Sequence, residues 1–441
     1  MRYLIHRPYI INIGQISIGS VLIENDKITD IFSGEVPPAV FENSNVIEAE
    51  GLYLFPGIID DQVHFREPGM TYKGDIESES KAAVAGGITS FMEMPNTKPA
   101  TTDIKAIEDK LKRASDTSWA NYSFYIGATN DNYKEICAAD PSMIAGIKIF
   151  LGSSTGNMLV DNEDSLNYIF EKAKVLVAVH SEDEAIIQKN LQEAITQYEN
   201  DIPSYLHAEI RSHEACVSST LRAIERARKY NTRLHVLHLS TAEEAKLFGN
   251  SNPQKHITAE VCVHHLWFSE QDYSEKGNLI KWNPSIKKYA DREELRKALT
   301  EGRIDIVATD HAPHSIEEKE KVYTECPSGG PLVQHSLPAM LDMYHQGIFS
   351  LETIVDKMCH APARIFGVKK RGFIEKGYFA DLVLVDLQKP WTVSKENILY
   401  KCGWSPFEGH TFQSSVVSTF INGVPVFHNG VFTGLKDARK L

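Results

Sequence analysis

Short apolar runs that alternate with amphipathic stretches constrain the fold of this chain more than any other feature. Eight such runs recur in its central part: Leu54–Asp60, Ser90–Met94, Tyr122–Ala128, Ile144–Leu151, Val175–His180, Arg233–Leu239, Ile257–Val261 and Ile304–Thr309. Runs this short indicate buried β-strands. The stretches between them have helical periodicity: Asp75–Ala85, Asp103–Arg113, Glu182–Tyr198, Ile210–Lys229 and Arg292–Glu301. Repeated strand–helix–strand units predict right-handed crossovers and a parallel sheet.

Eight such units favour a closed (β/α)8 TIM barrel over an open doubly wound sheet, and no G-x-G-x-x-G follows the first run. Both ends of the chain have strand-like texture instead: Tyr9–Ile13, Ile16–Ile23, Ile28–Phe32 and Val46–Glu48 before the barrel, and Gly372–Glu375, Leu382–Asp386, Val416–Ile421 and Val424–His428 after it. We therefore predict an α/β fold with a barrel over residues 54–366. Residues 1–53 and 367–441 are expected to form one composite β-sandwich domain beside it.

Composition excludes several classes of partner. The net charge of −13 and the absence of a dense Lys/Arg run argue against nucleic acid. No apolar stretch reaches the roughly 18 residues of a membrane span, and the N-terminus lacks a secretory apolar segment. The six cysteines are scattered without a C-x-x-C pair, which predicts reduced thiols in a cytoplasmic protein. We expect a small-molecule substrate, and a homodimer as the default oligomer.

Polar side chains follow the predicted strands where each one ends. Gln62, His64 and Arg66 come directly after the first run and share one strand parity. Similar groups lie at or just after the ends of later runs, namely Asn96, His180, His238, Asp310 and His314, and the fourth run carries Lys148 within it. Barrel enzymes carry their chemistry at this end of the strands. A single strand-end histidine is more often structural, but three histidines and an aspartate on different strands fit a hydrolytic metal site. His235 has the opposite parity to His238 and is interpreted as packing.

Lys148 is unusual because it lies among apolar neighbours such as Ile147 and Ile149. A buried ammonium without a partner is unfavourable. One interpretation is a side chain whose stem lines the barrel while its head reaches water. The other is that burial lowers its pKa, so that the neutral amine captures carbon dioxide and the carbamate bridges two metal ions.

Five motifs carry a resemblance to a known family. They are V-H-F-R-E-P-G at Val63–Gly69, E-M-P-N-T at Glu93–Thr97, I-K-I-F-L-G-S-S-T-G at Ile147–Gly156, V-H-S-E at Val179–Glu182 and A-T-D-H-A-P-H at Ala308–His314. With them the chain resembles the cyclic amidohydrolases, and among these the dihydroorotase branch, from Gly51 to about Leu387. The resemblance implies a metal-bearing barrel beside a β-sandwich. It implies zinc, as one or two ions, and a carboxylated Lys148.

The resemblance also implies roles for individual residues. The metal ligands would be His64, Lys148, His180, His238 and Asp310. The residues that hold a substrate carboxylate would be Arg66, Asn96, Asn283 and His314. Asp310 would also move the proton during reversible hydrolysis of the ring amide of dihydroorotate. Arg66 favours this acidic ring because a guanidinium fork suits a carboxylate, and a hydantoin or allantoin as substrate is the alternative.

One position departs from the family pattern. The first-strand motif of the family is His-x-His, and this chain has Gln62-Val63-His64. An amide oxygen is a poor zinc ligand, so we expect weaker metal binding near the first strand. The other ligands, Lys148, His180 and His238, are intact. Gln62 also supports another alternative, an inactive homologue kept as a structural partner of another pyrimidine enzyme; the five retained ligands oppose it.

Overall fold

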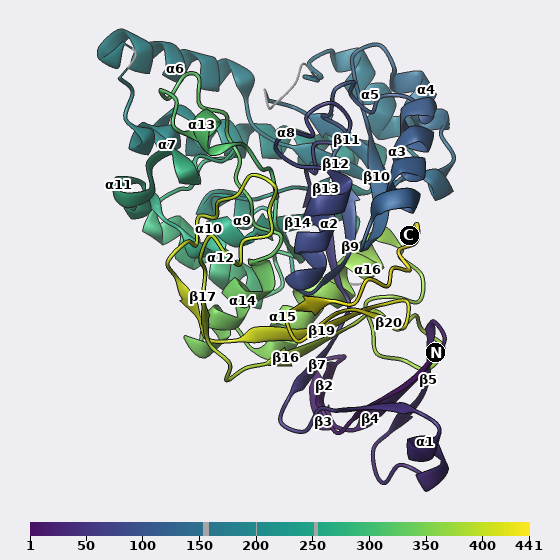
Figure 1. The fold of residues 1–441 in the computed structure, drawn as a ribbon. Coiled ribbons are helices and arrows are strands. Elements are labelled where there is room, and N and C mark those ends of the chain that lie inside the picture. The colour runs from purple at the N-terminus through teal and green to yellow at the C-terminus, as the bar shows by residue number, and fades with distance from the viewer. Residues whose placement is uncertain (153–157, 200, 251–254) are drawn as a thin grey trace.

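A parallel barrel forms the centre of the molecule in the computed structural model, which describes residues 1–152, 158–199, 201–250 and 255–441 (Figure 1). One eight-stranded sheet has its strands in sequence order from β8 to β15, which confirms the predicted barrel. The strands are β8 (Ile58–Val63), β9 (Ile88–Glu93), β10 (Asn121–Gly127), β11 (Gly146–Phe150), β12 (Val177–His180), β13 (Leu234–Val236), β14 (Ile257–Cys262) and β15 (Ile306–Ala308). Residues 153–156 of the predicted I-K-I-F-L-G-S-S-T-G motif lie outside the described residues.

The five predicted helices are present beside these strands. They are α2 (Ile76–Ala85), α3 (Ile104–Thr117), α6 (Glu184–Tyr198), α8 (His213–Tyr230) and α12 (Tyr289–Thr300). The other described α-helices are α1 (Pro38–Glu42), α4 (Tyr133–Ala138), α5 (Glu163–Lys172), α7 (His207–Ile210), α9 (Ala242–Ala245), α10 (Val263–Trp267), α11 (Tyr273–Lys276), α13 (Ile316–Lys319), α14 (Ser336–His345), α15 (Leu351–Val355) and α16 (Ala361–Phe366). None of the helices in the described part of the chain is long and apolar enough to cross a bilayer.

The expected first strand, Leu54–Asp60, is wrong as a single element, because the chain changes sheet within it. Tyr53–Pro56 is β7 of a separate sheet, and the barrel begins at Ile58. Gly57 joins the two strands. A Cβ there would lie 2.4 Å from Thr89 Oγ1 and 2.7 Å from Asp381 Cβ, so this close passage requires glycine.

The barrel closes between its first and last strands. Val63 forms a parallel bridge with His311, and the backbone N–H of His64 donates to the carbonyl of His311 over 2.7 Å. This contact brings the end of β8 beside the end of β15. His64 and Asp310, which are far apart in the sequence, therefore meet at one face of the barrel.

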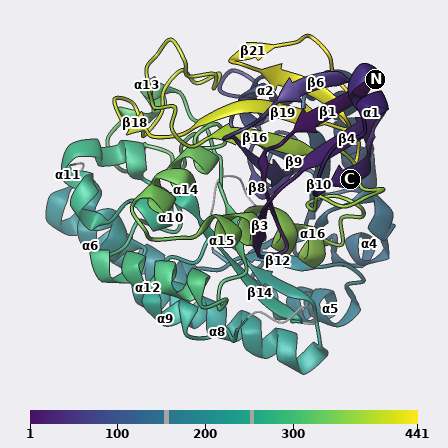
Figure 2. The same ribbon diagram turned by 90° about the horizontal axis from the view of Figure 1, so that it is seen from below.

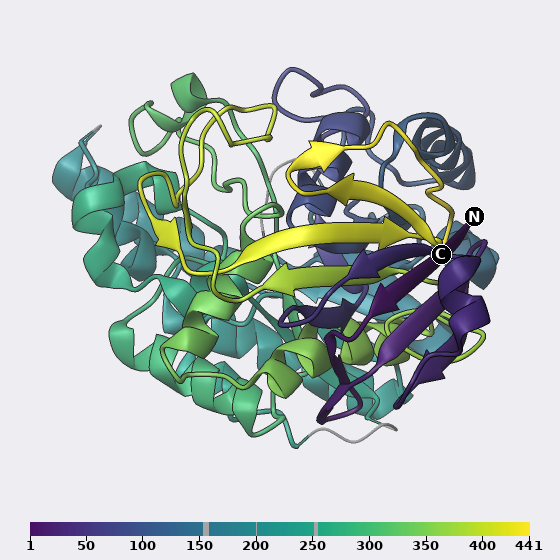
Figure 3. The same ribbon diagram turned by 60° about the horizontal axis from the view of Figure 1, so that its bottom comes forward.

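The two ends of the chain share a seven-stranded sheet, as predicted. Its order is β21-β20-β19-β16-β7-β2-β3. The N-terminal segment supplies β2 (Tyr9–Asn12), β3 (Gln15–Ile18) and β7, and the C-terminal segment supplies β16 (Leu382–Asp386), β19 (Ser415–Ile421), β20 (Val424–His428) and β21 (Val431–Phe432). The C-terminal strands, in yellow and green, run beside the purple N-terminal ones (Figures 2 and 3).

A second sheet is built from the N-terminal segment alone. Its order is β5-β4-β1-β6, with β1 (Arg2–His6), β4 (Ser20–Glu24), β5 (Lys27–Phe32) and β6 (Asn45–Glu48). Ile5, Leu54 and Leu382 belong to one buried cluster between the two sheets. The expected strand Ile16–Ile23 is therefore wrong as one strand, since it divides between the sheets. The expected strand Gly372–Glu375 is not a strand.

The division of the chain into domains at residues 53/54 and 366/367 stays a proposal. A short pair, β17 (Trp391–Thr392) and β18 (Thr411–Phe412), completes the described strands.

Candidate active site

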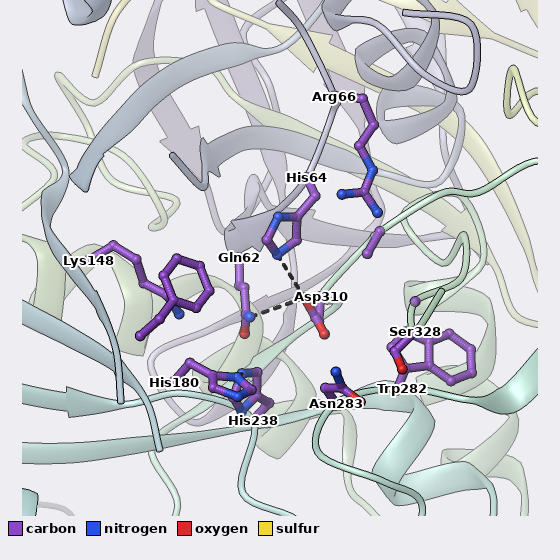
Figure 4. A pocket seen from close by; sticks show the side chains of 13 residues that line it. Gln62, His64, Arg66, Lys148, His180, His238, Trp282, Asn283, Asp310 and Ser328 are labelled. Carbon is purple, nitrogen blue, oxygen red and sulfur yellow. Dashed lines mark hydrogen bonds and ion pairs between the residues drawn. The ribbon is translucent and has the colours of Figure 1, made fainter. Parts of the chain in front are cut away.

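A pocket lies at the carboxyl ends of the barrel strands (Figure 4). It is lined by Gln62, His64, Arg66, Lys148, Phe150, His180, His238, Trp282, Asn283, Asp310, Ala312, Ser328 and Gly329. All five predicted metal ligands thus meet in one place, together with two of the predicted substrate-binding residues. The other two, Asn96 and His314, do not line the pocket but contact residues that do. Their assignment to the substrate carboxylate stays a prediction.

Asp310 lies at the centre of the pocket and is held through one oxygen. Gln62 Nε2 donates to Asp310 Oδ1 over 3.1 Å, and His64 Nε2 lies 3.1 Å from the same oxygen. On its other side, His64 Nδ1 lies 2.7 Å from the amide oxygen of Asn96. An N–H at Nδ1 that donates to Asn96 leaves the lone pair on Nε2, the nitrogen that would bind the predicted metal. Asp310 Oδ2 is the oxygen that these contacts leave available.

His180 and His238 form the opposite side of the pocket. His180 Nδ1 lies 3.0 Å from His238 Nε2, and His238 Nδ1 is buried without a hydrogen-bond partner. Burial, followed by the positive charge of nearby groups, lowers the pKa of His238 well below its usual value. Neutral imidazoles are metal ligands, and two ligands of a tetrahedral zinc lie about 3.3 Å apart. The pair therefore fits a metal ion.

A buried carboxylate supports His180 from outside the pocket. Glu182 Oε2 lies 3.0 Å from His180 Nε2 and also forms an ion pair with Arg211. Burial alone would raise the pKa of Glu182, but the charges of Arg211 and His180 bring it to about 2. The contact has ion-pair distance but not the geometry of a hydrogen bond; the negative charge of Glu182 nevertheless favours a proton on Nε2, and Nδ1 then faces His238. Glu182 lies in the V-H-S-E motif, but the sequence interpretation gave it no role.

Lys148 is almost completely buried, at 1% exposure, with its Nζ 4.6 Å from the centre of the Phe150 ring. Burial lowers its pKa to about 7, against the opposing influence of Asp310 and Glu260. Among the described residues, no carboxylate lies within ion-pair distance of its nitrogen. The buried-amine interpretation fits this environment better than a head that reaches water. A neutral amine beside metal ligands is what carboxylation would require.

Arg66 presents a buried cation to the pocket. Its Nε donates to the carbonyl of Pro313 over 3.0 Å, and its Nη2 lies 3.0 Å from His314 Nε2. Within the described ranges, no carboxylate forms an ion pair with it. Burial lowers its pKa to about 10, which still leaves the group charged near neutral pH. A charged guanidinium enclosed at 1% exposure calls for an anion from outside the protein.

The backbone is strained at three pocket residues. Arg66, His238 and Asp310 have φ values of +72°, +41° and +46°. Non-glycine residues with positive φ cost of order 1 to 2 kcal/mol each, and such residues cluster at functional sites. Strand parity therefore does not set the direction of Arg66, because β8 ends at Val63 and a left-handed turn follows.

Two buried clusters near the site were missed or only partly understood from the sequence. His264 stacks on Trp282 with ring centres 4.3 Å apart, and Trp282 lines the pocket. His235 is more than packing: its Nε2 lies 3.3 Å from Asp61 Oδ2 and 3.2 Å from Glu260 Oε2. Burial would lower the pKa of His235, but these two carboxylates raise it to about 9. It does not line the pocket; with Asp61 and Glu260 it forms a separate buried group whose potential ligand atoms lie within 4.8 Å of one another.

Comparison with known proteins gives a family and two kinds of neighbour. The model of the amidohydrolase family matches residues 53–426. A dihydroorotase from Pyrococcus furiosus is 34% identical over 418 residues, which cover 94% of this chain and 90% of that protein. A dihydroorotase from Methanosarcina acetivorans is 34% identical over 400 residues, which cover 88% of this chain and 84% of that protein.

Solved structures of a hydantoinase and a dihydropyrimidinase share the fold. The L-hydantoinase (dihydropyrimidinase) of Arthrobacter aurescens has a TM-score of 0.92 at 25% identity, over 99% of this chain and 98% of its own. The dihydropyrimidinase of Brevibacillus agri has a TM-score of 0.89 at 25% identity, over 100% and 98%. Sequence relatives and structural neighbours therefore carry different enzyme names.

Proposed function

We propose that this chain, which belongs to the amidohydrolase family and within it to the dihydroorotases, catalyses the reversible hydrolysis of (S)-dihydroorotate to N-carbamoyl-L-aspartate in pyrimidine biosynthesis. The observation that carries the proposal is Arg66, a buried guanidinium in the pocket lining without an ion-pair partner among the described residues. The ring of dihydroorotate carries a carboxylate that would neutralise it. A hydantoin or dihydropyrimidine ring has no such group, and its binding would leave the charge uncompensated.

The proposed cofactor is zinc, as one or two ions. His180 and His238 would hold it together with Lys148 in its carboxylated form, and His64 and Asp310 would complete the ligand set. A bound zinc ion lowers the pKa of its water to about 7 and polarises a carbonyl oxygen. Gln62 donates to Asp310 Oδ1, so in this arrangement it supports the carboxylate and is not itself a ligand.

Asp310 would move the proton. Its Oδ1 accepts from Gln62 and faces His64, so Oδ2 is available to the reacting groups. During hydrolysis a bond forms from the water oxygen to the ring carbonyl carbon, and the ring carbon–nitrogen bond breaks. Asp310 Oδ2 takes the proton from the water and returns it to the leaving nitrogen. Arg66 holds the carboxylate, and Trp282 and Phe150 form walls of the pocket that limit water.

A substrate panel tests the proposal. We expect the protein to hydrolyse dihydroorotate, and Arg66→Met to lower its kcat/KM by about 100-fold or more, because a charge-assisted bidentate contact is lost. The same change should affect an uncharged ring such as dihydrouracil far less. Arg222→Met is the matched control, since its side chain is 56% exposed and pairs with Asp183 outside the pocket. Equal damage to both rings would remove the reason for choosing the acidic one.

Two alternatives have distinct outcomes. Preferred turnover of a hydantoin or dihydropyrimidine would place the chain with its structural neighbours instead. A purified protein without metal and without turnover would support the inactive homologue. Cytoplasmic location belongs to the same proposal, because all six cysteines are free thiols.

A further inference from the structure

A buried lysine touches the histidine that Arg66 contacts. Lys73 is 4% exposed, and its Nζ lies 2.9 Å from His314 Nδ1 and 3.2 Å from Glu318 Oε1. It does not line the pocket, and no step proposed above uses it. We propose that Lys73 is a positioning residue that sets the tautomer of His314 and so keeps Arg66 available for the substrate carboxylate. This inference rests on the proposed function.

The hydrogen-bond partners of His314 allow two arrangements. Its Nδ1 faces the Lys73 ammonium at 2.9 Å and Glu318 Oε2 at 3.4 Å. Its Nε2 faces Arg66 Nη2 at 3.0 Å and the carbonyl of Ser328 at 3.1 Å. Burial, followed by the charge of Arg66, keeps the pKa of His314 well below its usual value, so the ring is neutral. A neutral imidazole accepts at one nitrogen and donates at the other.

Lys73 selects between these arrangements. An ammonium only donates, so the shorter contact at Nδ1 makes that nitrogen the acceptor. The proton then sits on Nε2, which donates to the carbonyl of Ser328. Arg66 Nη2 faces an N–H instead of a lone pair and cannot donate to it. Because Arg66 and Ser328 line the same pocket, an anion bound there is the acceptor that remains.

Without Lys73 the opposite tautomer is favoured. Nδ1–H would donate to Glu318, and Nε2 would accept from Arg66. The guanidinium would then be bound within the protein, and a substrate would have to break that hydrogen bond. The balance of charges agrees with this assignment. Arg66 and Lys73 are both cations. In the described part of the chain, Glu318 is the one carboxylate within ion-pair distance of Lys73, and none lies within that distance of Arg66. One positive charge is left for a carboxylate.

The first experiment reads the tautomer directly. In protein with 15N-labelled histidine, the His314 signal is identified by its loss in His314→Gln. We expect wild type to have the Nε2–H form and Lys73→Met to have the Nδ1–H form. Lys73→Arg should retain the wild-type tautomer, because it also only donates. Lys98→Met is the matched control: it removes an exposed neighbouring positive charge that no hydrogen bond joins to His314.

The second experiment measures the consequence for the substrate. Lys73→Met should raise the KM for dihydroorotate by about tenfold and change kcat by less than about twofold, since uniform binding is lost. Lys73→Arg should recover most of this loss, and Lys98→Met should behave as wild type. An unchanged tautomer in Lys73→Met, or an unchanged KM, would overturn the inference. Failure of wild type to hydrolyse dihydroorotate would instead refute the proposed function, and the tautomer measurement would still decide the role of Lys73.

Discussion

At the residue scale, the position of the proton on three histidines at or beside the pocket is set by a contact with a residue that does not line the pocket. Glu182, Asn96 and Lys73 each hold one nitrogen of a histidine and so decide what its other nitrogen can do. None of the three lines the pocket. Such supporting contacts are worth testing because they change affinity without removing a ligand.

Glu182→Gln should weaken metal binding by about 10- to 100-fold, because the amide no longer holds the proton on His180 Nε2. The measurement is the metal affinity from competition with a chromogenic chelator. Glu193→Gln on the exposed side of α6 is the control and should bind metal as wild type does. Unchanged affinity in Glu182→Gln would show that Glu182 serves only Arg211.

Lys148→Ala should lose metal and turnover together, if the lysine supplies a bridging carbamate. Metal content by plasma mass spectrometry and turnover of dihydroorotate are measured on the same preparation. Depletion of bicarbonate should reduce the metal content of wild type, and its return should restore it. Full turnover in Lys148→Ala would contradict the bridging role.

At the element scale, the junction between β7 and β8 sets the position of the first barrel strand. Gly57 sits where the chain leaves the seven-stranded sheet and enters the barrel. A register shift between Asp60 and Val63 follows in β8; it includes the pocket residue Gln62 and comes just before His64. A substitution that displaces this junction should therefore shift the pocket residues as well as disturb the packing of the core.

Gly57→Ala should destabilise the protein by about 1 to 3 kcal/mol, because its Cβ would lie 2.4 Å from Thr89 Oγ1. Urea unfolding followed by circular dichroism gives the free energy of unfolding. Gly34→Ala is the matched control, since a Cβ there meets nothing within 4 Å. Equal stability of the two variants would mean that the junction can relax.

At the scale of the whole molecule, the composite sheet and the barrel are joined by buried polar contacts. Asp381 precedes β16 and forms an ion pair with Arg371. It also accepts from Asn121 Nδ2 of β10 over 3.1 Å, and its carbonyl accepts from the backbone N–H of Gly57. The C-terminal segment also contacts a residue behind the pocket, since Trp404 Nε1 donates to the carbonyl of His314 over 2.7 Å.

Asp381→Ala should cost about 3 to 5 kcal/mol of unfolding free energy, because it leaves the Arg371 charge buried without its partner. The exposed pair of Lys376 with Asp30 offers a control: Asp30→Ala should cost less than about 1 kcal/mol. Chemical denaturation of both variants checks this. A small cost for Asp381→Ala would mean that this carboxylate contributes little to joining the two parts. A homodimer stays a prediction, which light scattering can test.

Periodicity in the sequence was enough for the barrel, the composite sheet and the polar side chains near the strand ends, because burial and strand geometry are local consequences of the residue pattern. Thus His180 ends β12, His238 lies two residues beyond β13, and Lys148 lies within β11. The sequence could not show that Ile16–Ile23 divides between two sheets, because apolar residues occur in both pieces. Only the pairing with neighbouring strands distinguishes them. The same applies to Leu54–Asp60.

Tertiary structure alone decided which polar groups face the pocket and which support it. Barrel closure places His64 beside Asp310, and positive φ at Arg66 turns its side chain in a direction that strand parity does not predict. Tertiary structure also places Asn96 and His314 outside the pocket lining, where each contacts a residue that lines it. The residue types in a sequence indicate which chemical groups are available. Which partner each histidine nitrogen contacts depends on distances between segments that are far apart in the sequence and meet only in the folded chain.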